Sequence, residues 1–293
     1  MLPDIVSLAL FARVAETHSI TKAASASHIA LAAASRRMSL LDHQFGIKLL
    51  ERSARGAELT PAGRAVLYRA RLILSQVDQL RAEVAEFAGG TKGHVRIQAS
   101  ASAISQSLPG DLATFAAAAP HVAIDLEERA SGEIAQAVRE GATDVGILME
   151  GTVLEGLEHF EYEVDRLVVV VPRNHPLRGK SILFSATLEY DFVGLERDTA
   201  ISRLLTDRAA VAQKVLRARV LVRSFAAMCK IVESGLAIGV LPEGAARPFL
   251  STMKLRIIRL GDTWATRHMY VCIRDYQTLP AIARKLFDHL VKR

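Results

Sequence analysis

Two groups of polar residues in this sequence could do chemistry, one near the N-terminus and one in the later two thirds. The first group combines arginine, lysine, serine and threonine, which donate hydrogen bonds to phosphate oxygens and to base edges. The second consists of serine and threonine residues that directly follow short apolar runs. Hydroxyls at such positions can bind a small molecule or cap a helix.

Catalysis is the rival interpretation. Ser19 and Lys22 have the S-x-x-K spacing of a serine acyl-transferase nucleophile, but no SDN or KTG partner occurs. The nine histidines form no HExxH or other dense ligand spacing, and His175 in "NHPL" fits a strand-to-loop turn. No GxGxxG, Walker loop or GxSxG occurs. We therefore expect no catalytic residue, metal or cofactor, and keep as the alternative a two-lobed α/β enzyme with a fused basic helical head.

Length and composition set the protein class. A chain of 293 residues with 50% hydrophobic content can bury a large core and suggests about two domains. Apolar runs such as "LVVVVP" are too short to span a bilayer, and Asp4 stands where a secretion signal carries lysine or arginine. Cys229 and Cys272 lie in apolar segments without a CxxC pair, so we expect core residues. These features predict a cytoplasmic protein that does not bind membranes.

The basic charge is concentrated in the first third of the chain. The net charge is +6 and the pI about 9.5. Residues 1–92 contain 12 Lys and Arg against 8 Asp and Glu, and the other 201 residues contain 25 against 23. This distribution favours a nucleic-acid-binding head, although a modest basic excess is also common on solvated surfaces.

The alanine-rich stretch 19–38, "SITKAASASHIALAAASRRM", predicts two short helices that pack closely. A first helix starts behind Pro3 and Asp4, and Ser19 can cap a second over 20–26. A third runs over 31–42 before a glycine stop at Gly46. Helix, tight turn, helix is the DNA-binding helix-turn-helix, whose second helix enters the major groove. A solvent-facing alanine-rich helix is the alternative.

From Leu8 to Gly63 the chain resembles the N-terminal domain of LysR-type transcriptional regulators. The segments "SITKAA", "AAASRRM" and "FGIKLLERSARGAELTPAG" follow that family's order and spacing without a gap. The resemblance implies a winged helix-turn-helix over 1–60. The family's recognition helix usually opens Ser-Gln-Pro, whereas this chain has Ala30, Leu31 and Ala32, which removes a glutamine that could bond a base edge.

The expected DNA contacts come from the two helices and the wing. Ser35 and Arg36 are candidates for base or groove contact, and Thr21, Arg37, Arg52 and Arg55 for phosphate contact. For any single arginine, a solvated surface charge is the alternative. The complete predicted DNA-binding set is Thr21, Ala30, Leu31, Ala33, Ser35, Arg36, Arg37, Lys48, Arg52, Arg55 and Thr60.

A linker helix and hinge are expected over 61–90. The helix starts at the capping pair Thr60-Pro61, and Gly89-Gly90 end it and form the hinge. Its apolar residues recur at alternating spacings of four and three, which predicts a dimerisation coiled coil. A helix packed on its own domain is the alternative. The seam residues are Val66, Ala70, Ile73, Val77, Leu80, Val84 and Phe87.

From residue 91 onward, short β runs alternate with helices, which predicts mainly parallel sheets covered by helices. The segments "LPGDLATFAAAAP", "GATDVGI", "VVVVPRNHPL" and "VESGLAIGVLP" resemble the effector-binding region of LysR-type regulators. The resemblance implies a two-lobed domain over 91–293, similar to periplasmic binding proteins. Lobe one would comprise 93–163 and 268–293, and lobe two 164–267.

In such a domain the ligand binds in a cleft at the carboxyl ends of strands, near helix N-termini that favour anions. The expected hydroxyl contacts and apolar wall come from "SASAIS", "ASGE", "RDTAIS" and the segment around 225. Helix capping is the alternative role of the Ser and Thr residues. The predicted effector-binding set is Ser100, Ala101, Ser102, Ser131, Thr199, Ala200, Ile201 and Phe225.

Taken together, the residues and the resemblance predict an α/β protein with an all-α N-terminal part that regulates transcription. Its expected partners are double-stranded promoter DNA, a small and anionic effector, and further copies of itself in a homodimer or homotetramer. RNA polymerase is a further expected partner. A purely architectural DNA binder would not require some 200 residues of ligand-pocket fold.

Overall fold

A computed structural model describes residues 3–53, 56–87, 93–196 and 199–291. The side chains of 52–53, 75, 78–79 and 81–87 lie outside this description. The chain divides into two compact units, residues 1–93 with 139–142, and the remainder.

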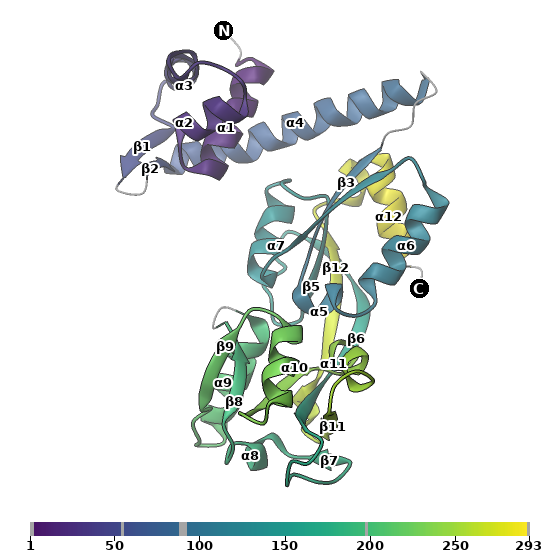
Figure 1. Cartoon of the computed structure of the whole chain (residues 1–293). Coiled ribbons are helices and arrows are strands. Elements are labelled where there is room, and N and C mark those ends of the chain that lie inside the picture. The colour runs from purple at the N-terminus through teal and green to yellow at the C-terminus, as the bar shows by residue number, and fades with distance from the viewer. Residues whose placement is uncertain (1–2, 54–55, 88–92, 197–198, 292–293) are drawn as a thin grey trace. The chain divides into compact units, whose positions relative to one another are not determined.

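The first unit is a helical head with a two-stranded wing (Figure 1). Asp4 caps the first helix through Ser7 N, Ser19 caps the second through Lys22 N, and Gly46 ends the third in the left-handed conformation. The helix expected over 20–26 is confirmed, and the third extends three residues beyond the predicted Asp42. The elements are α1 (Ile5–Thr17), α2 (Ile20–Ala26), α3 (Leu31–Phe45), β1 (Leu50–Ser53), β2 (Gly56–Leu59) and α4 (Pro61–Phe87).

The alanines of 19–38 fall into two classes. Ala23, Ala24 and Ala34 are fully buried in the core of the head, together with Phe11 and Leu41. Their small side chains allow α2 and α3 to approach closely. The solvent-facing alanine-rich helix is therefore wrong for these three positions.

Two glycines allow close backbone contacts around the wing. Gly56 has a φ of +116°, and a Cβ there would lie 2.3 Å from the carbonyl oxygen of His18. That carbonyl accepts a hydrogen bond of 2.9 Å from Ala57 N, which joins β2 to the turn after α1. A Cβ on Gly63 would lie 2.0 Å from the carbonyl oxygen of Leu49. Both positions require glycine because no side chain fits there.

The second unit contains two lobes of mixed α/β structure. The short β runs expected after residue 91 form strands, which alternate with helices. The elements are β3 (His94–Ala99), α5 (Ala101–Ile104), α6 (Leu108–Ala118), β4 (Ala123–Glu128), α7 (Ser131–Arg139), β5 (Val145–Met149), β6 (Glu158–Pro172), β7 (Ser181–Ile182), α8 (Phe184–Thr187), β8 (Phe192–Leu195), α9 (Ala200–Val211), β9 (Ala218–Val222), α10 (Phe225–Glu233), β10 (Ile238–Pro242), α11 (Glu243–Leu250), β11 (Leu255–Leu260), β12 (Thr266–Ile273), α12 (Ala281–Val291) and the 3-10 turns η1 (Thr263–Ala265) and η2 (Tyr276–Thr278).

In lobe one the strand order is β4-β3-β5-β12-β6. Pairs β3–β4 and β3–β5 are parallel, whereas β12 is antiparallel to both β5 and β6. Helix α7 covers one face, where Ile134 packs with Leu148, and α6 and α12 cover the other, where Phe115 packs with Leu286 (Figure 1).

In lobe two the order is β6-β10-β8-β9, with β11 also paired to β6. Pairs β8–β9 and β8–β10 are parallel, and β6 is antiparallel to β10 and β11. The expected mainly parallel sheets are thus only partly right, because the long strands β6 and β12 form antiparallel pairs with their neighbours. The core includes the consecutive valines 168–171, which a strand covered on both faces requires.

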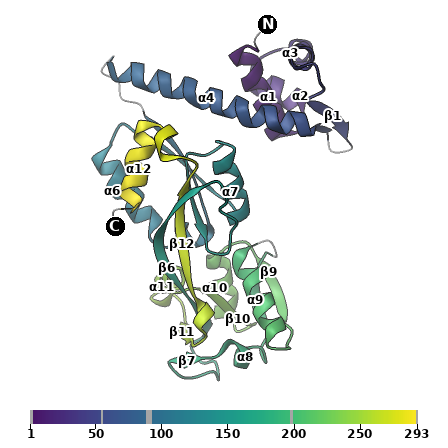
Figure 2. The ribbon, with the colours of Figure 1, turned by 180° about the vertical axis from the view of Figure 1, so that it is seen from behind.

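Strands β6 and β12 pass from one lobe to the other side by side (Figures 1 and 2). The lobe crossings expected near 163–165 and 267–268 lie on these strands, where Arg267 is the register partner of Asp165 and His268 of Val164. The start of β6 at Glu158, nine residues before the apolar run that begins at Leu167, is hidden in the sequence by the charged segment "EHFEYEVD". The lobes are therefore joined by a continuous ladder.

Candidate functional site

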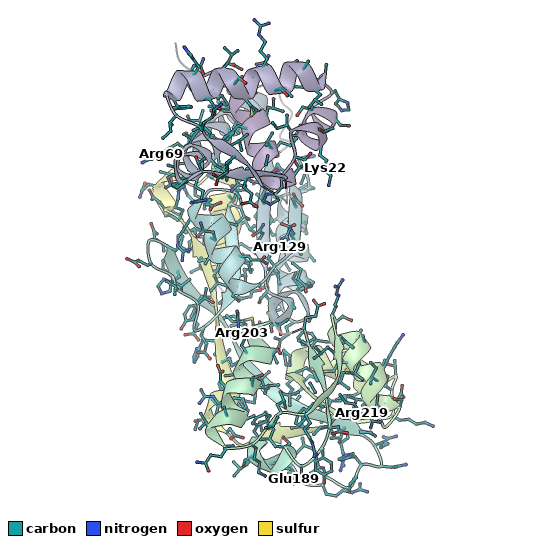
Figure 3. All side chains as sticks on the ribbon, turned by 90° about the vertical axis from the view of Figure 1, so that its left-hand side faces the viewer. Lys22, Arg69, Arg129, Glu189, Arg203 and Arg219 are labelled. Carbon is teal, nitrogen blue, oxygen red and sulfur yellow. The ribbon has the colours of Figure 1, made fainter. Side chains whose placement is uncertain are left out.

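The first candidate site is the exposed surface of α2 and α3. Thr21 and Lys22 on α2, and Ser35 and Arg36 on α3, are all exposed (Figure 3 labels Lys22). Arg13 on α1 donates to the carbonyl of Ala26 at 3.0 Å and to Ser27 Oγ at 2.8 Å, which holds the turn between the helices. Sequence patterns did not single out this arginine, because its partners lie 13 and 14 residues away.

The first turn of α3 is apolar and open. Ala30, Leu31 and Ala33 are exposed, and Ala30 caps the helix without a side-chain hydrogen bond. Such small and apolar side chains can contact a thymine methyl group but cannot donate a hydrogen bond to a base. Any hydrogen-bonded base readout by α3 must therefore come from residues further along the helix.

Arg37 has partners within the head. Its Nη1 lies 3.2 Å from Asp4 Oδ1 and 3.1 Å from Ser7 Oγ, and its side chain is only 38% exposed. The pKa of Asp4 is held below its usual value, chiefly because the Ser7 hydroxyl donates a hydrogen bond to it, with Arg37 adding its charge. This guanidinium ties α3 to the start of α1, and the expected phosphate contact of Arg37 stays a prediction.

Residues around the wing divide between exposed and structural roles. Lys48 is exposed and lies 3.0 Å from Asp42 Oδ2. Thr60 Oγ1 donates to the carbonyl of Lys48 at 2.8 Å and accepts from Gly63 N at 2.9 Å, so it caps α4 rather than facing DNA. Arg52 is on β1, but its side chain, like the whole of Arg55, lies outside the described residues.

The predicted dimer seam on α4 is divided. Ala70 is 1% exposed and lies with Val66 against the core of the head, as the alternative of a helix packed on its own domain predicts. Ile73 and Leu80 are 45% and 59% exposed, and Val77 is half-buried. Ala70 therefore leaves the list of seam contacts. The side chains of Val84 and Phe87 lie outside the described part of α4.

The second candidate site is a cavity of about 240 Å³ between the two lobes, here called the interlobe cavity. Segments at the carboxyl ends of β3, β4 and β8 and the starts of α7, α9 and α10 form its walls. All eight residues of the predicted effector-binding set, from Ser100 to Phe225, line this cavity. The described lining residues also include Glu128, Arg129, Ala130, Glu133, Met149, Leu195 and Glu196.

The hydroxyl groups around the interlobe cavity differ in their bonding. Ser131 Oγ accepts from Met149 N at 3.2 Å, and Thr199 Oγ1 accepts from Ser202 N at 3.2 Å, so both also serve as structural acceptors. Ser100 is 6% exposed, yet its Oγ has no hydrogen-bond partner among the described residues. A buried hydroxyl without a partner carries a desolvation cost that a bound ligand can remove.

The interlobe cavity is also lined by charged residues that are absent from the predicted effector-binding set. Glu133 accepts from Ala130 N at 3.2 Å, and Glu196 lies 2.6 Å from Arg223 Nε. Arg129, labelled on lobe one in Figure 3, pairs with Glu127, and this hydrogen bond raises the pKa of the guanidinium. The sequence position of these residues could have identified them. Glu128 ends β4, Arg129 follows it, and Glu196 follows β8.

A buried ion pair lies beside the interlobe cavity at the lobe crossings. Arg267 Nη2 donates to Asp165 Oδ2 and lies 3.5 Å from Ser102 Oγ. The two charged residues are 3% and 1% exposed. Asp165 Oδ1 and Arg267 Nε have no hydrogen-bond partner among the described residues. The crossing strands are thus linked through one guanidinium to a hydroxyl that lines the cavity.

The described lining of the interlobe cavity includes no histidine, cysteine or lysine, so its serine hydroxyls have no imidazole or amine base there. The described residues also form no cluster of three or more potential metal ligands. Nor does any helix in the described ranges have the length and apolar character needed to cross a membrane.

A winged helix-turn-helix head followed by a two-lobed domain with a central cavity defines a DNA-binding regulator that senses a ligand. Residues 5–64 match the bacterial regulatory helix-turn-helix protein, lysR family, and residues 88–293 match the LysR substrate binding domain. The chain belongs to the LysR family of transcriptional regulators.

Relatives and solved structures agree with this assignment. The chain is 30% identical over 246 residues to the probable HTH-type transcriptional regulator LrrA of Synechococcus elongatus, covering 84% of this chain and 83% of the relative. The fold is similar to that of a full-length OxyR variant from Pseudomonas aeruginosa, with a TM-score of 0.71, 18% identity and coverage of 100% and 94%. Full-length CbnR complexed with its target DNA gives a TM-score of 0.66, 22% identity and coverage of 99% and 99%.

Proposed function

We propose that this LysR-type regulator binds promoter DNA as a homo-oligomer and changes its activity when a small, anionic molecule occupies the interlobe cavity. It acts in the cytoplasm and by regulation rather than catalysis. The domain division is the one expected from the sequence, with the head over 1–60, the linker over 61–90 and the effector-binding domain over 91–293.

The observation that carries the effector proposal is the meeting of hydroxyls from both lobes in one cavity. Ser100 and Ser131 belong to lobe one and Thr199 to lobe two, and all three line it. A ligand that contacts both lobes stabilises the lobe orientation in which those contacts form. The Ser100 hydroxyl, which has no partner among the described residues, can supply a hydrogen bond to such a ligand.

An anionic ligand is supported by the helix N-termini at the cavity. The first residues of α7 and α9 line it, and helix N-termini favour negative charge. The cavity lining also includes the carboxylates of Glu128, Glu133 and Glu196, of which the last two are engaged with Ala130 N and Arg223. The hydroxyls and the helix N-termini are the groups that we propose bind the anion.

DNA binding is proposed for the exposed surface of α2, α3 and the wing. Arg36 and Ser35 are the proposed base or groove contacts, and Thr21 and Arg37 the proposed phosphate contacts, with Arg52 and Arg55 added from the sequence. The exposed Ile73 and Leu80 support dimerisation through α4. A dimer or a dimer of dimers bound at a promoter would also lie beside RNA polymerase, which remains a proposed partner.

A thermal-shift screen of small carboxylates on the full chain tests the effector proposal. A carboxylate that raises the melting temperature should bind Ser100→Ala and Thr199→Val several-fold more weakly, because each substitution deletes a hydroxyl and nearly keeps the shape. Ser105→Ala, exposed and outside the cavity lining, is the matched control and should bind like the parent. Equal affinity for all four proteins would place the effector site elsewhere.

A further inference from the structure

Lobe two contains a second and larger cavity, of about 410 Å³, here called the lobe-two cavity. It lies between helix α9 and strands β8 and β9, and Met228 of α10 and Val240 of β10 reach it from the core. Leu195 and Ile201 line both this cavity and the interlobe cavity. Protein interiors are normally packed with few voids larger than a water molecule, so a space of this size calls for an explanation.

Small residues stand where strands β8 and β9 form one side of this cavity. Gly194 has no side chain, and its register partner is Leu221. A Cβ on Gly194 would lie 3.0 Å from Leu221 Cδ2 and 3.6 Å from the Cβ of Ala218, so Leu221 already covers Gly194. Ala218 also lines the cavity, and a larger residue there would reduce its volume.

The lining is apolar inside and polar at one side. Phe192, Leu205, Met228 and Val240 are buried and contribute only apolar atoms, apart from their backbone. The polar side is formed by the α9 residues Ser202, Arg203, Thr206 and Asp207. Pockets for small molecules have this composition, with an apolar body and few polar groups that orient the ligand.

The polar side offers both a donor and an acceptor of hydrogen bonds. Arg203, labelled on lobe two in Figure 3, and Asp207 are exposed, and neither forms an ion pair with a residue that the structure describes. Thr206 Oγ1 donates to the carbonyl of Ser202 at 2.8 Å, which leaves its lone pairs as acceptors. The cavity volume falls within the range of about 300–1,000 Å³ typical of ligand pockets.

We infer that the lobe-two cavity is a second ligand-binding site, for an amphiphile with an aromatic or branched apolar body and one small polar head group. The apolar body occupies the space between α9 and strands β8 and β9, and the head group lies against Arg203 and Asp207 on α9. This binding does not depend on the proposed effector site.

The position of this cavity has a consequence for the effector site. Because Leu195 and Ile201 form a wall of each cavity, a ligand in one changes the packing of the other. The coupling, unlike the binding itself, rests on the proposed function. A ligand in lobe two would therefore alter the effector affinity at a site it does not touch.

Two methionines distinguish the cavities in one experiment. Met228 lines the lobe-two cavity and Met149 the interlobe cavity. In full-length protein labelled at the methionine methyl groups, NMR signals assigned with Met149→Leu and Met228→Leu report on each separately. The probe is 8-anilinonaphthalene-1-sulfonate, whose rings are apolar and whose sulfonate and amine supply an acceptor and a donor.

Saturable titration should move the Met228 signal further than the Met149 signal. Ala218→Leu, which places extra bulk beside Gly194, should abolish the Met228 shift, and Ser105→Ala should retain it. Arg203→Gln, an exposed substitution that cannot disturb the core, should weaken binding several-fold. These four results together support the second site.

The opposing outcomes separate the two proposals. A shift confined to Met149 would overturn the second site while leaving the effector proposal standing. Fluorescence enhancement without a shift of either methyl group would mean binding elsewhere on the surface and would overturn it as well. If Ala218→Leu fails to fold, an unchanged affinity of Arg203→Gln combined with an unshifted Met228 decides against the inference.

Discussion

Arginines that are adjacent in the sequence have different environments in the head. Arg36 is exposed on α3, whereas Arg37 is held by Asp4 and Ser7. A guanidinium has five N–H donors, so an internal partner takes up part of its hydrogen-bonding capacity and offsets part of its charge. Consecutive residues on a helix point about 100° apart, which explains how neighbours acquire separate roles.

Arg36→Ala should weaken specific operator binding by about 1–3 kcal/mol, or roughly 5–150-fold, if the guanidinium contacts a base. Fluorescence anisotropy with an operator selected from random duplexes measures this. Arg37→Ala is the neighbouring control and should change operator affinity less, because it removes an internal ion pair. Unchanged affinity of Arg36→Ala would remove this residue from the base contacts.

The two cysteines are buried in the cores of different lobes, Cys229 in lobe two and Cys272 in lobe one. Burial raises the pKa of the Cys229 thiol to about 11, so at pH 7 only about one molecule in 10⁴ carries the reactive thiolate. We expect neither thiol of the folded protein to react with Ellman's reagent at pH 7, and both to react in guanidinium chloride. Rapid labelling of the folded protein would contradict the buried environment.

At the scale of elements, α4 serves two purposes along its length. Its N-terminal part packs on the head through Leu67 and Ala70, and further along it exposes Ile73 and Leu80. A heptad pattern read from sequence does not separate a seam between subunits from a stripe packed within one. Exposure separates them, because a residue that is already buried in its own domain adds little contact with a partner.

Ile73→Glu combined with Leu80→Glu should convert dimers to monomers, because association would desolvate both charges. The single subunit should still fold, since both positions are exposed. Sedimentation velocity measures the change, and Ser75→Glu, which the heptad places opposite the seam, is the control. A double variant that still sediments as a dimer would locate the dimer contact outside this seam.

At the scale of the whole molecule, the two strands that cross between the lobes are joined by the buried Arg267–Asp165 pair. Arg267→Met should lower the free energy of unfolding by about 3–5 kcal/mol, because it leaves a buried carboxylate without its partner. Adding Asp165→Leu should recover much of that loss, since the double variant buries no charge. Urea unfolding of the full chain measures both. A single variant as stable as the parent would mean that water reaches the pair in solution.

The charge of the whole chain gives a second prediction at this scale. DNA binding that neutralises about 6–10 phosphates should lose about 10³–10⁵ in affinity between about 50 and 200 mM salt. The basic excess in the first 92 residues predicts that the head carries this dependence. Affinity measured over a salt series checks it, and a flat response would argue against phosphate contacts.

Local features of this protein were determined by the sequence itself. The caps at Asp4, Ser19 and Thr60, the stop at Gly46 and the apolar runs of the strands depend on residues a few positions apart. Hydrogen bonds within a helix turn and the alternation of a strand repeat over short intervals. For that reason the helix-turn-helix and the positions of the strands along the chain could be predicted, as could the segments that line the interlobe cavity.

Contacts between distant residues were decided only by the tertiary structure. Arg37 meets Asp4 across 33 positions, and Arg267 meets Asp165 across 102. The lobe-two cavity follows from how α9 packs over strands β8 and β9, which has no local signature. Such contacts depend on strand register and on how helices pack, which are set by the balance of packing over the whole core rather than by any short segment.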